Sequence, residues 1–392
     1  MTSRTLKTSL LALLMALPVN LALAEVTASF SYPLSNFEGP VLSQWAKLAV
    51  DSERNEIYAL HQRKNDIRIF DEHGMEIFVF AEGLGSAADI AIGDDGDIFL
   101  LTRGYQTSAV HLLNFRGEEV AEISLQNVPS TFSKFAADRL VHRNNSLYLV
   151  DSDSMRVLVV DEAGRFETSY DLSREIKPFI PREDRQRELS INSWRKKTLE
   201  DIALNGFTVD NEGNFFFTVP VLFSAFKLSP RGELRRFGKS GSGKGKFGVV
   251  SGIATDDKGY IYVSDRLRSV VLVFDRKLMF QTEFGYRGNQ PSNLIVPDDL
   301  AIDSLGNVYV GQAANRGVSV FKVVHQEASP PLVGETMKNN QGQSSRMTEE
   351  RVSDRPEFAV DQGNDLASAN SGDTGGNAEA VESQRKEVNQ DE

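Results

Sequence analysis

The chain has 392 residues, a net charge of −12 and no cysteine. The lack of cysteine excludes disulfides, thiolate zinc sites and haem attachment through cysteine. Any folded part must therefore be stabilised by its own apolar core, which a chain of this length can supply.

The first 24 residues have the pattern of a secretory signal. Arg4 and Lys7 precede an apolar run over residues 10–17, and residues 22–24 form a small-x-small cleavage site. The alternative is a membrane anchor, but the run is shorter than the roughly 20 residues that a spanning helix needs. We therefore expect a periplasmic or secreted protein whose mature chain begins at Glu25 and has no transmembrane anchor.

A short antiparallel meander recurs six times, and residues 250–275 give its clearest copy. Alternating apolar residues predict strands around Ile253, over 260–264 and over 270–274, joined by turns rich in Asp and Gly. We also expect Asp151 and Asp265, at equivalent places directly after the second strand, to bind the backbone of the following turn. The second strand starts at Ile57, Ile98, Leu147, Phe215, Ile261 and Val308.

These starts are separated by 41, 49, 68, 46 and 47 residues. Four-stranded propeller blades occupy roughly 40 to 50 residues, so the spacing predicts six blades with an insertion at the longest interval. The predicted outer strands cover residues 76–80, 119–125, 165–170, 233–237 and 279–284. Because no outer strand follows the sixth meander, we expect residues 25–32 to pair there, close the ring and protect an open edge.

Residues 237–275 and 284–321 resemble NHL repeats, in which a Gly-rich approach precedes a strand, a turn and a closing aliphatic-Phe strand. The resemblance covers residues 25–324 and implies an all-β, six-bladed propeller with four-stranded antiparallel blades. It also implies a binding platform for protein, RNA or ligands more often than an enzyme. RNA is disfavoured by export and by a charge of −6 on the repeats, since the tail carries −8 and the signal +2 of the total −12.

Two segments depart from the repeats. The insertion over residues 172–204 is either a surface excursion with one short helix or a lid or docking element. Its Trp194, Arg195, Lys196 and Lys197 are the candidate contacts for a partner. The segment from 325 to 392 contains 14 acidic and 6 basic residues and predicts a disordered acidic tail, which serves solvation or recognition.

Residues 238–245 resemble a phosphate-binding loop, but Gly245 stands where a Ser or Thr is needed. The loop also precedes a strand and not a helix, so we interpret it as a connection between blades. Basic residues surround it and form a patch, which is either simply solvated or binds an acidic partner or the acidic tail of the chain itself. They are Arg231, Arg235, Arg236, Lys239, Lys244 and Lys246.

Three aspartates are the candidate metal ligands. Counting back from the aligned first strands places Asp89, Asp138 and Asp299 together with Lys47, Gly206 and Gly252 around one mouth of the central channel. Carboxylates there can hold a hard cation such as calcium. Alternatively, they accept hydrogen bonds from backbone N–H groups of neighbouring blades.

Two functions follow. The first is an exported, monomeric, non-catalytic platform that binds a protein, peptide or glycan. The alternative is a metal-dependent hydrolase or lyase, lactonase-like or amidating-lyase-like, with its site in the central channel. An enzyme of that kind requires ligands from three or more blades around an open metal position.

Overall fold

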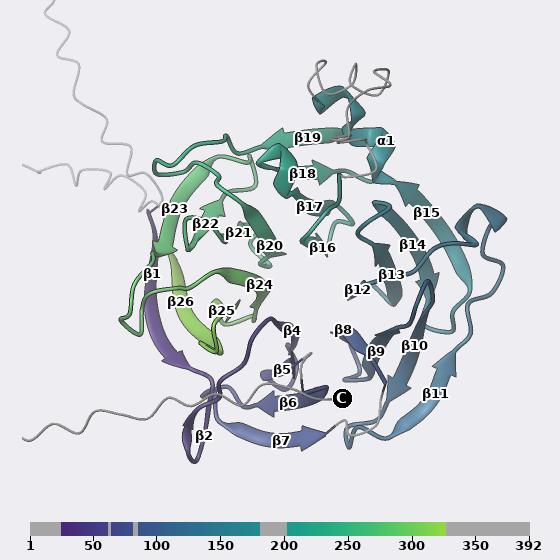
Figure 1. Cartoon of the computed structure of the whole chain (residues 1–392), viewed down its shortest axis with the longest axis horizontal. Helices are drawn as coiled ribbons and strands as arrows, with labels where there is room; N and C mark the ends of the chain where they lie inside the picture. The colour runs from purple at the N-terminus through teal and green to yellow at the C-terminus, as the bar shows by residue number, and fades with distance from the viewer. Residues whose placement is uncertain (1–24, 62–63, 81–84, 181–201, 327–392) are drawn as a thin grey trace, which may run out of the picture. The chain divides into compact units, whose positions relative to one another are not determined.

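The computed structural model describes residues 25–61, 64–80, 85–180 and 202–326. Six four-stranded antiparallel sheets are arranged radially around a central channel (Figure 1). This confirms the predicted all-β, six-bladed propeller.

The blades follow one another in chain order. Blades one to three contain β4 (Ala46–Asp51), β5 (Glu56–His61), β6 (Asp66–Phe70) and β7 (Glu76–Phe80); β8 (Ala87–Ile92), β9 (Ile98–Arg103), β10 (Ser108–Leu113) and β11 (Glu119–Ile123); and β12 (Arg139–Arg143), β13 (Ser146–Asp151), β14 (Arg156–Asp161) and β15 (Phe166–Asp171). Blades four to six contain β16 (Phe207–Val209), β17 (Phe215–Val219), β18 (Ser224–Leu228) and β19 (Leu234–Phe237); β20 (Val250–Thr255), β21 (Ile261–Asp265), β22 (Val270–Phe274) and β23 (Phe280–Gly285); and β24 (Pro297–Ile302), β25 (Asn307–Gln312), β26 (Val318–Gln326) and β1 (Glu25–Pro33).

The core lies between the blades. Every residue of β21 and β22 is buried, because both faces of a blade pack against its neighbours. One cluster, for example, joins Phe216 of blade four to Val263 of blade five. Outer strands are more exposed, as in β11. The apolar middle strands therefore read as continuous runs in the sequence and not as strict alternation.

The N-terminal strand closes the ring, as predicted. β1 pairs antiparallel with β26, from Glu25 opposite Gln326 to Pro33 opposite Ser319. A small hairpin of β2 (Ser35–Asn36) and β3 (Gly39–Pro40) then leads into blade one. The sequence did not predict this hairpin, since two-residue strands leave no periodic pattern.

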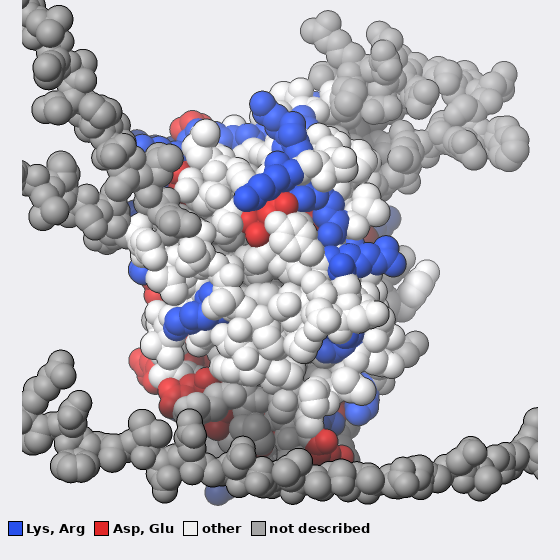
Figure 2. Space-filling view, turned by 90° about the vertical axis from the view of Figure 1, so that its left-hand side faces the viewer, with Lys and Arg blue, Asp and Glu red and all other residues white. Residues whose placement is uncertain are grey.

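The Gly-rich segment connects β19 to β20, which agrees with its interpretation as a connection between blades. Its Phe247 is fully buried against Phe274. Seen from the side of β1, β23 and β26, uncharged residues cover the middle of the surface and Lys and Arg gather towards the top (Figure 2). The predicted basic patch includes Arg235, Arg236 and Lys239, all of them exposed.

Only the ends of the predicted insertion lie within the described residues. It begins with α1 (Leu172–Ile176) and η2 (Lys177–Phe179), and Leu172 and Ile176 are buried against blades three and four. Short 3-10 turns also occur as η1 (Ser130–Phe132) and η5 (Pro220–Leu222). The proposed contacts Trp194, Arg195, Lys196 and Lys197, the signal and residues 327–392 of the tail lie outside the described residues. His325 and Gln326, predicted as the start of the tail, are instead the last residues of β26 and pair with β1. Within the described part, no helix has the length and apolarity needed to cross a bilayer.

Candidate binding site at one mouth of the channel

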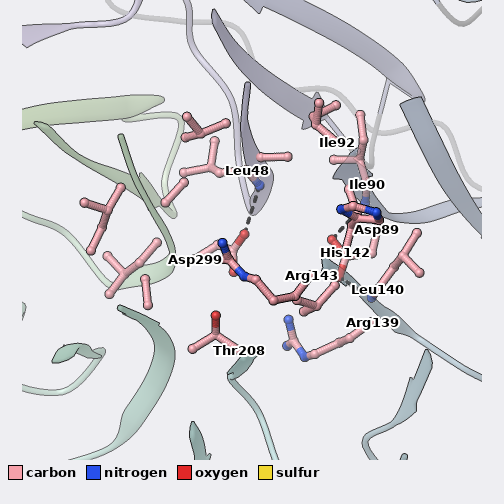
Figure 3. A pocket seen from close by; sticks show the side chains of 18 of the residues that line it. Leu48, Asp89, Ile90, Ile92, Arg139, Leu140, His142, Arg143, Thr208 and Asp299 are labelled. Atoms are coloured by element: carbon pink, nitrogen blue, oxygen red, sulfur yellow. Dashed lines mark hydrogen bonds between the residues drawn. The ribbon is translucent and has the colours of Figure 1, made fainter. Parts of the chain in front are cut away.

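The innermost strands of the blades surround a central cavity of about 330 Å³ (Figure 3). A second hollow of about 720 Å³ lies at the mouth where these strands begin. We call it the funnel, and its polar and aromatic lining consists of Trp45, Lys47, Ser86, Arg103, Asp138, Arg139, Arg266 and Asp298. Arg139 lines both spaces and so lies at their boundary.

The three predicted aspartates do not share one space. Asp89 and Asp299 line the central cavity, whereas Asp138 lines the funnel. Oδ2 of Asp299 accepts the Leu48 N–H at 2.9 Å, and Oδ2 of Asp89 accepts the Leu140 N–H at the same distance. Both bonds join neighbouring blades, which is the structural role that the sequence left open.

Asp138 binds within its own blade, where Oδ1 accepts the Ser152 N–H at 2.9 Å. The ammonium of Lys47 lies 3.8 Å from Oδ1 of Asp299. Among the described residues, no group of three or more His, Asp or Glu side chains is placed to hold a metal ion. The three aspartates therefore do not fit a shared calcium site in this arrangement. Calcium binding stays a prediction, and metal analysis of the purified protein would test it.

Gly206 and Gly252 occupy the equivalent positions in blades four and five. A Cβ on Gly252 would lie 2.2 Å from the carbonyl oxygen of Asp298, and one on Gly206 would lie 2.5 Å from that of Ser251. Glycine thus lets the innermost strands of blades four, five and six approach closely. Neighbouring blades are joined by aspartate at some positions and by close backbone contact at others.

Trp45, which no sequence motif indicated, lies directly before β4 and lines the funnel. Its φ of 56° is rare for a bulky residue, and such strained conformations often occur at functional sites. The Arg266 guanidinium lies 5.2 Å from the centre of the Trp45 ring, within range of a cation–π interaction. Its position was the one feature of the sequence that could have indicated a site, because Trp45 immediately precedes an innermost strand.

Arg266 is held by Asp298, which accepts bonds from its Nε at 3.1 Å and from its Nη2. The same Asp298 oxygen accepts the Ser251 hydroxyl. Ser251 in turn accepts the Asn205 side-chain amide at 3.0 Å, and Asn205 accepts Nη2 of Arg139 at 2.9 Å. This mouth network runs from Arg139 in blade three to Arg266 beside Trp45 and fixes these side chains before any partner binds.

The lining of the funnel carries four cationic side chains and two carboxylates. Burial by itself raises the pKa of Asp298, but Lys47, Arg266 and the Ser251 hydroxyl together hold it below its usual value. Asp298 is therefore ionised at neutral pH and retains Arg266. The funnel is cationic overall, although the protein as a whole is acidic.

Burial shifts the pKa values of two side chains, Asp89 and His61, in opposite directions. Burial raises the pKa of Asp89 to about 6, against an attraction from Lys47 and with a repulsion from Asp299. Burial lowers the pKa of His61 to about 4, although Asp66 Oδ1 lies 3.3 Å from its Nδ1. Arg68 and Lys64 lower the pKa of His61 further.

We expect single substitutions at these two sites to change the pH profile of stability in opposite ways. Between about pH 4 and 6, native Asp89 keeps a proton that the unfolded chain has lost, so its contribution falls as pH rises. Native His61 lacks a proton that the unfolded chain binds up to about pH 6.5, so its contribution rises with pH. Relative to the wild type, Asp89→Asn should make stability rise more steeply with pH and His61→Gln should make it rise less steeply, each by up to about 3 kcal/mol over this pH range.

Urea unfolding at intervals from pH 4 to 7 measures both effects. Asp94→Asn is the matched control, because Asp94 is exposed and should leave the profile unchanged. Profiles of both test variants that run parallel to the wild type would show that neither group titrates as described.

The chain is similar to several solved structures. A protein of unknown function from Bacteroides thetaiotaomicron matches with a TM-score of 0.53 and 14% identity, over 76% of this chain and 77% of that chain. A gluconolactonase from Xanthomonas campestris gives 0.48 and 9%, over 78% and 91%. Virginiamycin B lyase from Staphylococcus aureus gives 0.46 and 12%, over 74% and 86%.

The fold thus defines the chain as a six-bladed β-propeller, and at these identities the likeness does not extend to an activity. No family model matches the chain. The similarity of residues 237–275 and 284–321 to NHL repeats therefore remains a resemblance.

Proposed function

We propose that this protein is an exported, non-catalytic propeller that binds an acidic protein or peptide partner at the funnel. The observation that carries the proposal is the mouth network, which holds Arg266 over Trp45 at the edge of an open hollow. Trp and Arg are the residues most enriched among binding hot spots. Four cations in the lining favour an acidic partner and speed its association.

No specific observation on the described residues favours the alternative, a metal-dependent hydrolase or lyase. The carboxylates of the channel bind backbone amides, and the described histidines contact carboxylates. His142 Nε2, for example, lies 2.7 Å from Oε1 of Glu162. We therefore place the binding platform first.

The test is an array of octapeptides of graded charge, probed with the mature protein over residues 25–392. Binding should increase with negative charge, weaken at high salt and fall at least tenfold in Trp45→Ala and in Arg266→Ala. Lys177→Ala is the matched control, because this exposed lysine lies outside the funnel.

Equal binding by both funnel variants and the wild type would remove the funnel as the binding site. A preference for basic octapeptides would contradict the proposed class of partner.

A further inference from the structure

Arg139 combines a fixed guanidinium with an unused donor. Its Nη2 donates to Oδ1 of Asn205 at 2.9 Å. Its Nε is buried and has no hydrogen-bond acceptor among the described residues. Leaving a buried donor without an acceptor costs stability, so this arrangement is maintained against a penalty.

Arg143 on the same strand provides the contrast. Its Nε donates to the Val209 carbonyl at 3.2 Å and its Nη1 to Oδ1 of Asn211 at 3.1 Å. Arg143 therefore attaches blade three to blade four. Among the described residues, Arg139 makes one such contact, to Asn205, although it lies on the same strand as Arg143.

The nearby carboxylates already have other partners. Asp89 accepts the Leu140 N–H, and Asp299 accepts the Leu48 N–H and faces Lys47. Asp138 accepts the Ser152 N–H and lies 3.7 Å from Nη1 of Arg103. None of the three makes a hydrogen bond to Arg139, so the described residues leave the Nε donor without an acceptor.

We infer that Arg139 receives a carboxylate of the partner at the boundary between the funnel and the central cavity. The inference rests on the proposed function and names the group that enters deepest, either an Asp or Glu side chain or a chain end. Nε–H and the remaining Nη hydrogens of an Arg form a fork that matches the two oxygens of a carboxylate. Figure 3 shows the Arg139 side chain extending from its strand towards Thr208.

The location suits this role. Arg139 lines both hollows, so a group that passes through the funnel reaches it before the central cavity. Its anchor, Asn205, belongs to the same network as Asp298 and Arg266. Binding at Trp45 and binding at Arg139 would therefore act on one preformed set of side chains.

The test uses glutarate, a small dicarboxylate, with its neutral diamide and inorganic phosphate as comparison probes. We expect glutarate to shift the Arg139 Nε–Hε signal in ¹⁵N NMR spectra of the wild type, and the diamide to leave it unchanged. In calorimetry, Arg139→Gln should weaken glutarate binding at least tenfold, while Arg139→Lys, which keeps the charge but loses the fork, should weaken it less. Lys177→Gln should bind like the wild type.

Three results would overturn the inference. They are an unperturbed Nε–Hε signal with glutarate, equal glutarate binding by Arg139→Gln, and stronger binding of phosphate than of glutarate. The NMR measurement on the wild type needs no substitution, so it decides even if a variant folds poorly. If binding of acidic octapeptides still requires Trp45 and Arg266 but is normal in Arg139→Gln, the proposed binding platform is supported and the proposed role of Arg139 is refuted.

Discussion

A chain that begins at Leu34, and so lacks β1, should lose the closed propeller. β1 covers the edge of β26 along nine residues. It buries Val26 and places the Phe30 ring 5.7 Å from that of Phe321. Each large apolar side chain returned to water costs about 1.5 to 3 kcal/mol, so the loss from Val26 and Phe30 should be about 3 to 6 kcal/mol. Chemical denaturation with far-UV circular dichroism measures it.

Two controls separate closure from general damage. A synthetic peptide of residues 25–33, added to the truncated chain, should restore stability by supplying the missing strand. Ser29→Ala changes an exposed position of β1 and should stay within about 0.5 kcal/mol of the wild type. A truncated chain that unfolds at the same denaturant concentration as the wild type would refute closure by β1.

Asp298→Ala should lower both stability and partner binding. Asp298 is 7% exposed and accepts bonds from Arg266 and Ser251. Its loss leaves the Arg266 guanidinium without its carboxylate. Because the Arg266 side chain is 33% exposed, the cost should lie below the roughly 3 to 5 kcal/mol that is typical of breaking a fully buried pair. Released from Asp298, Arg266 should also leave the Trp45 ring. Denaturation and the octapeptide array measure the two effects.

Asp153→Ala is the matched control. The Asp153 side chain is 80% exposed and pairs with Arg103 at 3.4 Å, so its removal should cost less than about 1 kcal/mol. Asp298→Asn keeps an acceptor and should fall between the wild type and Asp298→Ala. If Asp298→Ala binds acidic octapeptides as well as the wild type, the mouth network does not position the binding residues.

The sequence determined the architecture because its signals are local. Turn residues and short apolar runs fix each meander, and their spacing predicts the number of blades. Asp265 shows the same locality, since its Oδ1 accepts the N–H groups of Leu267 and Arg268 at 3.0 and 2.9 Å, as expected for the following turn. The missing sixth outer strand also predicted the pairing of β1 with β26.

The position of the candidate site follows only from the tertiary structure. Counting along the sequence selects Asp299, but its neighbour Asp298 lines the funnel. Pairing is also irregular at the start of the innermost strands β8, β20 and β24, which shifts the direction of side chains in a way that alternation does not predict. The residues of the mouth network come from blades three to six, and closure of the ring places Trp45 of blade one beside Arg266.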